Sequence, residues 1–244
     1  MATRAQLDGR VALVTGGGRG IGRAIARELA ALGAAVAIVA RSPDQLDAVA
    51  RELAEAGAEA LPLVADLRDA AAPASVVDAV AARFGRLDVL VNNAAVGRFA
   101  TLEESDVDLW DELLAVNARA PFLLCGACLP YLRRAQPGFV VNVASVAALS
   151  GYAGQAAYVA SKHALLGLTR ALAKEVQADG IRVHAVCPGG TDTTLLRAAR
   201  PDLAAGEAMQ PHEVAELVAF LVTRRGVAVI DQVVLRRATA TPWP

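Results

Sequence analysis

Lysine is nearly absent from this 244-residue sequence, whose 24 basic residues are all arginines except Lys162 and Lys174. A lysine in a special position is therefore easy to notice. Aromatic residues amount to only 4% of the chain, while 55% of its residues are hydrophobic, mostly alanine and valine among them. This composition excludes a disordered chain and suits thin helices packed closely on a β-branched sheet.

Cysteine occurs three times, which is too few for a disulfide framework. Cys125 and Cys128 have the spacing of a redox or zinc pair, but they stand in a helical apolar stretch without a second pair of ligands. We interpret them as buried thiols. The three histidines, His163, His184 and His212, have no metal-ligand spacing, so the sequence predicts no metal site.

Excess charge and long hydrophobic runs are also lacking. The net charge of −1 gives no electrostatic signature of nucleic-acid binding. Glycine, aspartate or arginine interrupts the apolar runs before about 18 residues, so a membrane span is not expected. The polar segment Met1–Arg10 leads into a predicted strand without the apolar core of a signal peptide. We expect a soluble, cytoplasmic protein that binds neither nucleic acid nor membrane.

Apolar segments with the length of strands alternate with helical segments along the whole chain. The predicted strands are Val11–Thr15, Ala35–Ala40, Ala60–Ala65, Leu87–Asn92, Phe139–Ala144, Ile181–Cys187 and Val227–Leu235. The predicted helices are Ile21–Leu32, Pro43–Glu55, Pro73–Phe84, Val107–Leu132, Gln155–Gln177 and Pro211–Val222. The strands are apolar on both faces, as in a parallel sheet covered by helices on each side.

This alternation predicts an α/β fold of the Rossmann type, with a doubly wound, mainly parallel seven-stranded sheet and helices on both faces. No linker, repeat or low-complexity region divides residues 1–244. The sequence therefore predicts a single domain.

A glycine-rich turn joins the first predicted strand to the first predicted helix. It reads Thr15-Gly16-Gly17-Gly18-Arg19-Gly20-Ile21-Gly22. Such a turn can bring backbone N–H groups and a helix N-terminus to a pyrophosphate, and glycine permits both unusual φ angles and a close approach. A glycine-rich turn without a ligand is the alternative, but the order strand, turn, helix favours dinucleotide binding. We assign Gly16, Arg19, Gly20, Ile21 and Gly22 to the cofactor site.

The residues at the end of the second predicted strand indicate which dinucleotide, NAD(H) or NADP(H), the protein binds. A carboxylate there would hold a free ribose 2′-hydroxyl, but this chain has Arg41 and Ser42. Arg41 and Arg19 could together hold a 2′-phosphate, with a further hydrogen bond from Ser42. The alternative is a solvated Arg41 paired with Asp44 or Asp47. We predict NADP(H) in preference to NAD(H).

Tyr158 and Lys162 stand four residues apart on a predicted helix, one turn apart on one face. Reduction of a carbonyl group requires a proton donor at oxygen, and the ordinary tyrosine pKa of about 10 is high for reversible work near neutrality. A cation about 4 Å away contributes roughly 4 kcal/mol at an effective dielectric constant of about 20. We expect Lys162 to lower the pKa of Tyr158; an exposed Tyr/Lys helix face is the alternative.

The turn Thr15–Gly22 and the segment Tyr158–Lys162 together resemble the TGxxxGxG and YxxxK motifs of the short-chain dehydrogenase/reductase family. The resemblance extends from about Leu7 to Leu235. It implies a catalytic tetrad of Asn117, Ser145, Tyr158 and Lys162, in which the serine hydrogen-bonds the substrate oxygen and the asparagine holds a water of a proton relay. It further implies that the lysine holds the ribose hydroxyls, so Tyr158 and Lys162 also belong to the cofactor site.

Further segments resemble cofactor contacts of the same family. Asp66, with Leu67 after it, resembles an adenine-contacting position, and Asn92-Asn93-Ala94-Ala95 resembles the NNAG segment, with Ala95 in place of the final glycine. The segment after the sixth strand resembles the PGxxxT motif that holds the nicotinamide carboxamide. The resemblance therefore adds Asp66, Leu67, Asn93, Ala94, Pro188, Gly189, Thr191 and Thr193 to the cofactor site.

The substrate region is predicted more coarsely. In this family selectivity is set largely by a segment that corresponds here to a short lid at about 194–210, and Tyr152, Gln155 and Leu195 are candidate wall residues. At the C-terminal end the chain departs from the family pattern, because Arg236-Arg237 follow the last strand where many members have a glycine-rich segment.

The resemblance implies a homotetramer that pairs the helices Val107–Leu132 and Gln155–Gln177. Small residues on the second helix would permit a close approach: Ala156, Ala157, Ala160, Ala164 and Gly167. Alternatively, these residues pack only against the chain's own sheet.

Three functions are consistent with these residues. The first is an NADP(H)-dependent reductase or dehydrogenase that acts on a small-molecule carbonyl compound or alcohol. The second is a 3-oxoacyl thioester reductase, for which Arg133-Arg134 could form a basic rim, opposed by Asp179. The third, a dinucleotide-binding sensor without turnover, is disfavoured because its tetrad would be expected to be broken.

Overall fold

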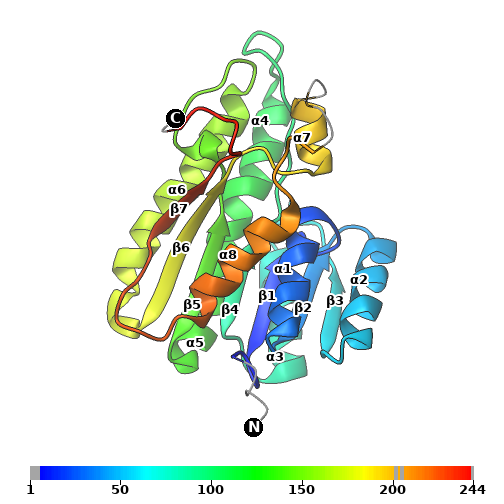
Figure 1. Cartoon of the computed structure of the whole chain (residues 1–244), viewed down its shortest axis with the longest axis vertical. Coiled ribbons are helices and arrows are strands. Elements are labelled where there is room, and N and C mark those ends of the chain that lie inside the picture. Colours follow the sequence, from blue (N-terminus) through cyan, green and yellow to red (C-terminus); the bar gives the residue numbers. More distant parts are fainter. Residues whose placement is uncertain (1–5, 201–202, 204–205, 243–244) are drawn as a thin grey trace.

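The computed structural model describes residues 6–200, 203 and 206–242. Its centre is a sheet of seven strands: β1 (Val11–Thr15), β2 (Ala35–Ala40), β3 (Ala60–Val64), β4 (Val89–Asn92), β5 (Gly138–Val143), β6 (Ile181–Pro188) and β7 (Gln232–Leu235). Their order in the sheet is β3-β2-β1-β4-β5-β6-β7, and every neighbouring pair is parallel (Figure 1). The predicted seven-stranded, doubly wound fold is confirmed.

Helices connect the strands. They are α1 (Gly20–Ala31), α2 (Pro43–Glu55), α3 (Ala72–Phe84), α4 (Val107–Leu114), α5 (Ala120–Ala135), α6 (Ala156–Glu175), α7 (Thr194–Ala199) and α8 (Pro211–Thr223). Several begin where the sequence supplies a cap: Asp106 accepts a hydrogen bond from the backbone N–H of Leu109 at 2.7 Å ahead of α4, and Gln210 with Glu213 forms a capping box on α8.

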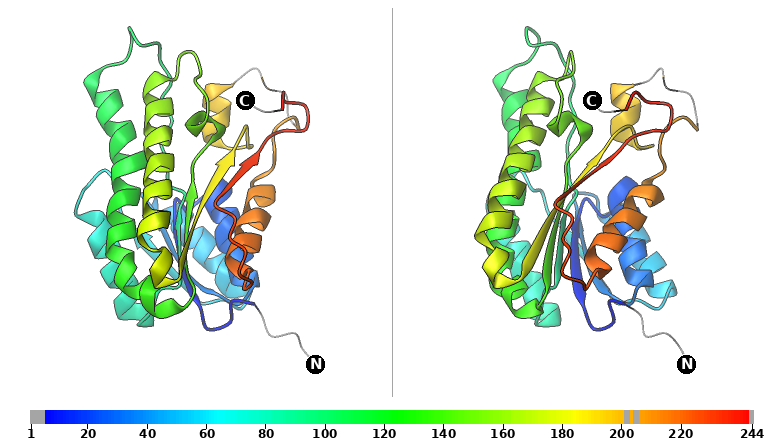
Figure 2. Two further views of the ribbon diagram at one scale, coloured as in Figure 1. Left: turned by 90° about the vertical axis from the view of Figure 1, so that its left-hand side faces the viewer. Right: turned by 60° about the vertical axis from the view of Figure 1, so that its left-hand side comes forward.

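Both faces of the sheet are covered because successive strand residues point to opposite sides. Ala12 and Val14 pack with the cluster that includes α1, α2 and α8. Val11 and Leu13 pack with the opposite cluster, which includes α3, α5 and the end of α6. Figure 2 shows the two helical layers on either side of the sheet.

The direction in which strands are added reverses between β1 and β4, because the chain adds β2 and β3 on one side of β1 and then returns to its other side. In an open α/β sheet the loops at the carboxyl ends of the strands diverge at such a point and leave a crevice. The topology therefore places a ligand site at the carboxyl ends of β1 and β4.

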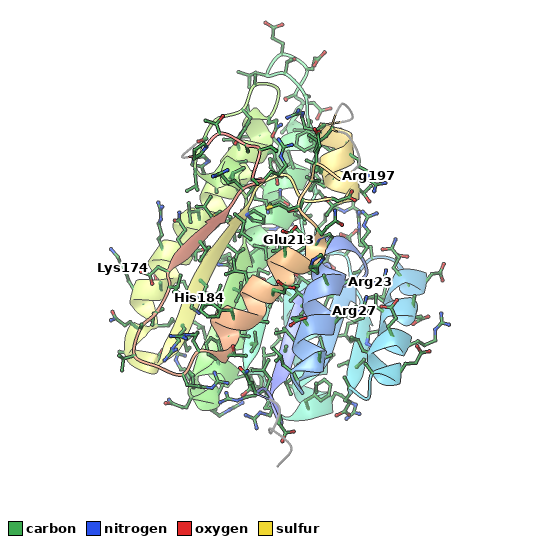
Figure 3. All side chains as sticks on the ribbon, in the orientation of Figure 1. Arg23, Arg27, Lys174, His184, Arg197 and Glu213 are labelled. Atoms are coloured by element: carbon green, nitrogen blue, oxygen red, sulfur yellow. The ribbon has the colours of Figure 1, made fainter. Side chains whose placement is uncertain are left out.

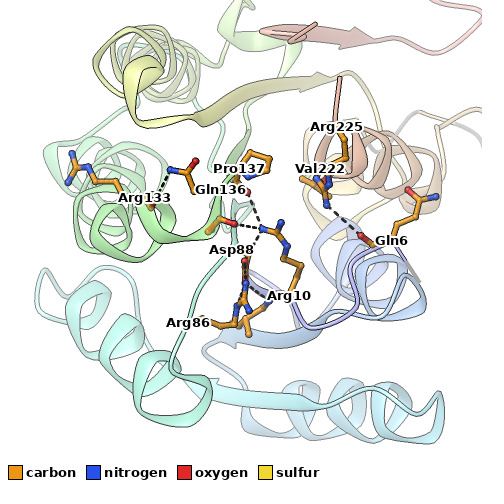
Figure 4. A network of polar contacts seen from close by, with 11 residues as sticks. Gln6, Arg10, Arg86, Asp88, Arg133, Gln136, Pro137, Val222 and Arg225 are labelled. Carbon is orange, nitrogen blue, oxygen red and sulfur yellow. Dashed lines mark hydrogen bonds and ion pairs between the residues drawn. The ribbon is translucent and has the colours of Figure 1, made fainter. Parts of the chain in front are cut away.

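At the opposite edge of the sheet, where the strands begin, a buried carboxylate holds neighbouring strands together through hydrogen bonds (Figure 4). Asp88, which is fully buried, accepts hydrogen bonds from the backbone N–H of Val11 at 2.9 Å and from the guanidinium groups of Arg10 at 3.0 Å and Arg86 at 2.7 Å. Arg10 also donates to the carbonyl oxygen of Pro137 ahead of β5. These contacts fix one end of the sheet, away from the crevice.

Two predicted elements differ from the structure by more than two residues at an end. The helix predicted over Val107–Leu132 is interrupted by a π-helical segment, Ala115–Arg119, between α4 and α5. The strand predicted over Val227–Leu235 extends only over Gln232–Leu235. Arg182 donates hydrogen bonds to the carbonyl oxygens of Arg224 and Gly226 at 2.9 and 2.7 Å. These bonds hold the segment ahead of Val227 against β6.

By length and composition alone, the helical stretch Val107–Ala135 could cross a membrane. Half of its most apolar window is nevertheless buried within the protein. A core helix of a globular protein meets the same criteria, so the stretch gives only weak support for a membrane span.

Candidate active site

A cleft of about 940 Å³ opens at the carboxyl ends of the strands, within the usual size of small-molecule and cofactor sites. It is lined by the turn after β1, by the ends of β2, β3, β4, β5 and β6, by the start of α6, and by α7 with the tail that follows β7. The cleft brings together nearly all of the residues assigned from the sequence. Gly22 and Asn117 are the two that do not line it.

The turn after β1 depends on glycine for two separate reasons. Gly16 and Gly20 have φ angles of +66° and +54°, which side chains rarely adopt. At Gly22 the reason is space, since an added Cβ would lie 2.2 Å from the carbonyl oxygen of Gly16. Gly22 therefore supports the turn without lining the cleft, whereas the cleft is lined by Gly16, Arg19, Gly20 and Ile21.

The end of β4 is fastened to this turn by hydrogen bonds to Thr15, which is 1% exposed. The backbone N–H groups of Asn93 and Ala94 both donate to Thr15 Oγ1 at 3.0 Å. The Asn93 side chain donates to the carbonyl oxygen of Thr15 at 2.9 Å. The predicted cofactor residues Asn93 and Ala94 are thus held beside the glycine turn.

Arg41 and Ser42 line the cleft at the end of β2. Among the residues that the structure describes, no ion pair joins Arg41 to Asp44 or Asp47. Asp44 lies in the first turn of α2, as predicted. Ser42 occupies the N-cap position of α2 without a side-chain capping bond, so its hydroxyl is not committed to the helix.

Asp66 lines the cleft where β3 ends, and buried Leu67 follows it. The Asp66 carboxylate accepts hydrogen bonds from Arg68 Nε and Nη2, the second at 2.5 Å, and from the Arg68 backbone N–H. These bonds lower the pKa of Asp66, with a smaller contribution from the charge of Arg41. Asp66 is therefore a fixed anion at the rim of the cleft.

Tyr158 and Lys162 lie in the first turns of α6, and both are buried at the base of the cleft. The Lys162 ammonium lies 5.9 Å from the centre of the Tyr158 ring and donates a hydrogen bond to the carbonyl oxygen of Val143 at 3.1 Å. That bond ties α6 to the end of β5.

The pKa prediction for Tyr158 was wrong in direction. Burial raises the pKa of Tyr158 to about 12, and a side-chain hydrogen bond with Ser145 acts in the opposite direction. Burial lowers the pKa of Lys162 to about 8. Removing the charged form of either group from water is costly, and for the tyrosine this cost exceeds the effect of the hydrogen bond with Ser145. The hydroxyl is held protonated.

Ser145 lies directly after β5 and lines the cleft. Its Oγ accepts a hydrogen bond from the backbone N–H of Ala147 at 3.1 Å, which fixes the side chain next to the short turn Val146–Ala148. Together with its hydrogen bond to Tyr158, this contact places two hydroxyl groups side by side at one point of the cleft.

Asn117 lies in the π-helical segment and is fully buried behind the cleft wall. Its Oδ1 accepts from the backbone N–H of Val96 at 2.9 Å, and its Nδ2 donates to the carbonyl oxygen of Val96 and to Ser161 Oγ, both at 3.0 Å. The structure thus places its amide between the loop after β4 and helix α6. This placement was not foreseen for a residue expected in a proton relay.

The segment after β6 forms another side of the cleft. Pro188, Gly189, Thr191 and Thr193 all line it, and Thr193 caps α7 by accepting from the backbone N–H of Leu196 at 3.3 Å. A backbone bond from Asp192 N–H to the carbonyl oxygen of Met209, at 2.7 Å, closes the base of the predicted lid. Within that lid, residues 201, 202, 204 and 205 lie outside the described part of the chain.

The predicted substrate residues Tyr152, Gln155 and Leu195 all line the cleft. Sequence reasoning missed Phe99, which packs edge-on against the Tyr158 ring with the ring centres 5.4 Å apart. It also missed Gln45 of α2 beside the glycine turn. Phe99 stands in an irregular loop after β4 without a periodic pattern, so no signal in the sequence could have placed it.

The cysteines take no part in the cleft. Cys125 and Cys128 are buried in α5 without a disulfide, and burial raises the pKa of Cys125 to about 12. In the described part of the chain, no cluster of three histidine, cysteine, aspartate or glutamate residues could hold a metal ion.

The residues of the cleft fit a dinucleotide. The N-terminus of α1 opens onto it through a turn that leaves no room for a side chain at Gly22, so backbone N–H groups can approach a pyrophosphate. Arg19, Arg41 and Ser42 stand at one end, while Tyr158, Lys162 and the segment after β6 stand at the other. Donor groups are therefore available along an extended, negatively charged ligand.

Comparison with known proteins agrees with this geometry. The family model described as short chain dehydrogenase matches residues 10–204. The chain is 41% identical over 183 residues to D-threitol dehydrogenase of Mycolicibacterium smegmatis, covering 75% of this chain and 70% of the relative. It is 37% identical over 222 residues to 3-oxoacyl-(acyl-carrier-protein) reductase FabG of Escherichia coli, covering 88% and 90%.

A solved structure of a metagenomic short-chain oxidoreductase in complex with NADP superposes with a TM-score of 0.84 at 40% identity. The match covers 96% of this chain and 99% of that one. The fold is thus similar to that of a protein solved in complex with NADP.

Proposed function

The chain belongs to the short-chain dehydrogenase/reductase family, and on that premise we propose that it interconverts a carbonyl compound and a secondary alcohol with NADP(H) as cofactor. The observation that carries the proposal is the grouping of Ser145, Tyr158 and Lys162 in the same cleft as the glycine turn. When bound, the cofactor supplies or accepts the hydride.

Tyr158 is the proton donor in this proposal. Its hydroxyl lies in the cleft beside Ser145, and the raised pKa of about 12 keeps it protonated, the form that can donate to a carbonyl oxygen. Ser145 orients that oxygen with a second hydrogen bond. In the reverse direction, the deprotonated form of Tyr158 accepts the proton of an alcohol, and the nearby ammonium of Lys162 stabilises the negative charge of that tyrosinate before the transfer.

Asn117 is a positioning residue in this proposal. Its amide joins Val96 of the cleft wall to Ser161, which lies between Tyr158 and Lys162 on α6. The second lone pair of its oxygen could still accept from a water of a proton relay. We propose the other site residues as the sequence predicted them. The cofactor residues lie along the cleft, and Tyr152, Gln155 and Leu195 form the substrate wall. The chain is a single domain with a short lid.

NADP(H) is proposed in preference to NAD(H). Arg41 lacks a carboxylate partner among the described residues, and the hydroxyl of Ser42 is not used as a cap. Arg19 lines the same end of the cleft. Two guanidinium groups and a hydroxyl suit a doubly charged 2′-phosphate. The solved neighbour in complex with NADP supports the proposal by likeness.

A 3-oxoacyl thioester reductase is the second candidate, supported by the likeness to FabG of Escherichia coli and by the position of Gln155 in the cleft. The proposed basic rim gives it less support. Arg133 is bound to Asp179 at 2.7 Å, and Arg134 stacks on Tyr131. Within the described part of the chain, the ion pair leaves only the charge of Arg134 uncompensated there for an acidic carrier protein. A sensor without turnover remains the third and least supported alternative.

The proposed enzyme is cytoplasmic and acts on small molecules, without nucleic acid or membrane as partner. We further propose a homotetramer. Cell fractionation checks the location, and a panel of ketones, alcohols and acyl thioesters, followed by nicotinamide absorbance, identifies the substrate class.

The experiment that tests the proposed chemistry is Tyr158→Phe. The variant loses only the hydroxyl, so kcat should fall by about 10² to 10⁴-fold, while the affinity for NADPH changes little. Tyr131→Phe, outside the cleft, is the matched control and should keep wild-type activity. A Tyr158→Phe variant that retains more than about a tenth of the wild-type kcat would show that another group donates the proton.

A further inference from the structure

The cleft is far more positive than the chain that contains it. The whole sequence has a net charge of −1, yet seven basic and two acidic residues line the cleft in the part of the chain described. Both acidic residues are already paired with arginines: Asp66 with Arg68, and Asp192 with Arg197 at 2.9 Å. A binding site of this charge favours an anionic ligand.

Three of the basic residues have roles in the proposed function. Arg19 and Arg41 stand at the ribose-phosphate end, and Lys162 stands beside Tyr158. The remaining four belong to α7 and its end or to the tail after β7: Arg197, Arg200, Arg236 and Arg237. Figure 2 shows the tail and α7 at the same end of the molecule.

Three of these four arginines have partners. Arg197 is held by Asp192, Arg200 is also engaged, and Arg236 donates to the carbonyl oxygens of Arg237, Ala238 and Ala240 within its own tail. Arg237 differs from them. It is partly buried, and within the described residues its guanidinium has neither an ion pair nor a side-chain hydrogen bond.

The path of the tail places Arg237 at the catalytic end of the cleft. The backbone N–H of Gly189 donates to the carbonyl oxygen of Leu235 at 2.8 Å. A Cβ added at Gly189 would lie 3.7 Å from Arg236 Cα and 3.8 Å from Val146 Cγ1. Since Val146 follows Ser145, the tail begins next to the proposed catalytic serine.

The Arg237 side chain then lies beside Gly190, as does Leu196 of α7. A Cβ added at Gly190 would lie 3.6 Å from Arg237 Nε and 3.3 Å from Leu196 Cδ1. By contrast, the glycine turn contacts Thr193, whose Cγ2 would be 3.3 Å from a Cβ at Gly20. Arg237 is therefore on the Ser145 side of this segment, and the pyrophosphate-binding turn is at its other end.

We propose that Arg237 is a specificity residue that binds an anionic group of the substrate, a carboxylate or a phosphate. The inference rests on the proposed function and adds a substrate class to it. A planar guanidinium can donate two parallel hydrogen bonds to either group. An unpaired, partly buried cation gains more from such a partner than a fully solvated one. The neighbouring Leu196 and Val146 side chains would contact the apolar part of the substrate.

The test compares oxo acids with their own neutral esters. Wild type, Arg237→Gln and Arg237→Lys are assayed with 4-oxopentanoate and 5-oxohexanoate, each beside its methyl ester. The wild-type preference for the acid, as a ratio of kcat/KM values, should fall about tenfold or more in Arg237→Gln and partly recover in Arg237→Lys. Turnover of the esters should not change.

A second pair distinguishes the source of the anion. A 3-oxoacyl phosphopantetheine thioester is compared with the N-acetylcysteamine thioester, which lacks the phosphate. If Arg237→Gln loses the preference for the phosphopantetheine thioester but keeps its acid-to-ester ratios, the proposal is supported and the anion is a phosphate. Arg27→Gln, which removes an exposed arginine on α1 (Figure 3), should behave as wild type in both pairs.

Two results would overturn the proposal. The first is that Arg237→Gln changes neither the acid-to-ester ratio of kcat/KM nor the ratio between the two thioesters. The second is that a rise in the KM for NADPH accounts for the whole loss of kcat/KM in this variant. The esters themselves test the proposed chemistry, because their reduction does not require Arg237. If no compound is reduced, the thermal stabilisation of the NADP⁺-loaded protein decides. Equal stabilisation of wild type and Arg237→Gln by 4-oxopentanoate then rejects the anion site.

Discussion

Arg41 is the side chain to which we assign the choice of cofactor. It stands at the end of β2, where a carboxylate would hold a free 2′-hydroxyl and repel a phosphate. Each charge-assisted hydrogen bond to a phosphate contributes about 1.5–3 kcal/mol, reduced by solvent screening. We expect wild type to prefer NADPH over NADH by roughly ten- to a hundredfold in kcat/KM.

Arg41→Asp should reverse this preference, because it removes the attraction and adds repulsion, with little change in kcat at saturating cofactor. The measurement is kcat/KM for both cofactors in wild type and variant. Arg27→Asp, on the outer face of α1, controls for the change in net charge. A wild type that prefers NADH, or a cofactor ratio that Arg41→Asp leaves unaltered, would show that the strand end has another role.

Lys162 should give the protein a pH-dependent stability. Its pKa is lowered to about 8 by burial, against about 10.4 in an unfolded chain. Between these values the unfolded state binds more protons than the folded state, so stability rises with pH in this window. Relative to Lys162→Met, the free energy of unfolding of wild type should rise by about 1–3 kcal/mol from pH 8 to about 10.5.

The free energy of unfolding is measured by urea unfolding across this pH range. The sequence offers one matched control, since Lys174 is the only other lysine and lies exposed near the end of the same helix (Figure 3). Lys174→Met should follow the wild-type curve. If Lys162→Met and wild type run parallel across the window, the buried ammonium has an ordinary pKa.

At the scale of elements, the connection between β1 and α1 has no spare volume. A Cβ at Gly22 would meet the backbone oxygen of Gly16 at 2.2 Å and Asn93 Nδ2 at 2.5 Å. Gly22→Ala must therefore displace the turn, which should lower stability by about 1–3 kcal/mol and weaken NADP⁺ binding by more than about tenfold. Fluorescence titration and urea unfolding measure the two effects.

Gly18→Ala is the matched control in the same turn. Its added Cβ would lie 3.1 Å from Gln45 Cβ and 3.4 Å from Ala40 Cβ, at a φ that any residue can adopt. At these distances the neighbours need to move far less than the backbone oxygen that a Cβ at Gly22 would meet, so we expect a smaller loss of both stability and binding. Equal losses in the two variants would mean that turn flexibility, and not space at Gly22, limits binding.

The π-helical segment between α4 and α5 is another feature of this scale. It widens one turn of an otherwise continuous helical stretch and carries Asn117 to the hydrogen bonds with Val96 and Ser161. Such bulges are frequent at functional sites because they re-aim a side chain without breaking the helix. The segment links the cleft wall to the helix that carries Tyr158.

At the scale of the whole molecule, the outer faces of α4, α5 and α6 carry exposed apolar and small residues. Trp110 and Phe122 are 45% and 61% exposed. Of the small residues expected at an interface, Ala156, Ala164 and Gly167 are exposed and Ala160 is partly so, whereas Ala157 packs inside the protein with Leu109 and Leu113. The expectation for Ala157 was therefore wrong, because its side of the helix faces α4.

These faces lead us to expect a tetramer, with a mass near four times the 25.2 kDa of one chain by light scattering at micromolar concentration. Gly167→Glu should dissociate it, because a charge would stand where two helices approach closely. Arg27→Glu, on the opposite side of the sheet, should leave the mass unchanged. A wild-type mass near that of a single chain rejects the interface.

The sequence alone determined the features that depend on neighbouring residues. Strand and helix periods, the order of elements and the glycine turn are local properties, and they predicted the sheet and the position of the cofactor cleft. The short-range spacing of Tyr158 and Lys162 likewise placed both side chains on one face of one helix. Each of these inferences needs only the geometry of a single element or turn.

Tertiary structure decided what depends on segments far apart in the chain. The direction of the Tyr158 pKa shift follows from burial by surrounding elements. Phe99 meets Tyr158, and Arg237 reaches Gly190, only because separate loops converge at the carboxyl ends of the strands. Local patterns carry no record of such long-range contacts, since packing and desolvation are fixed only when the whole sheet and its helices are assembled.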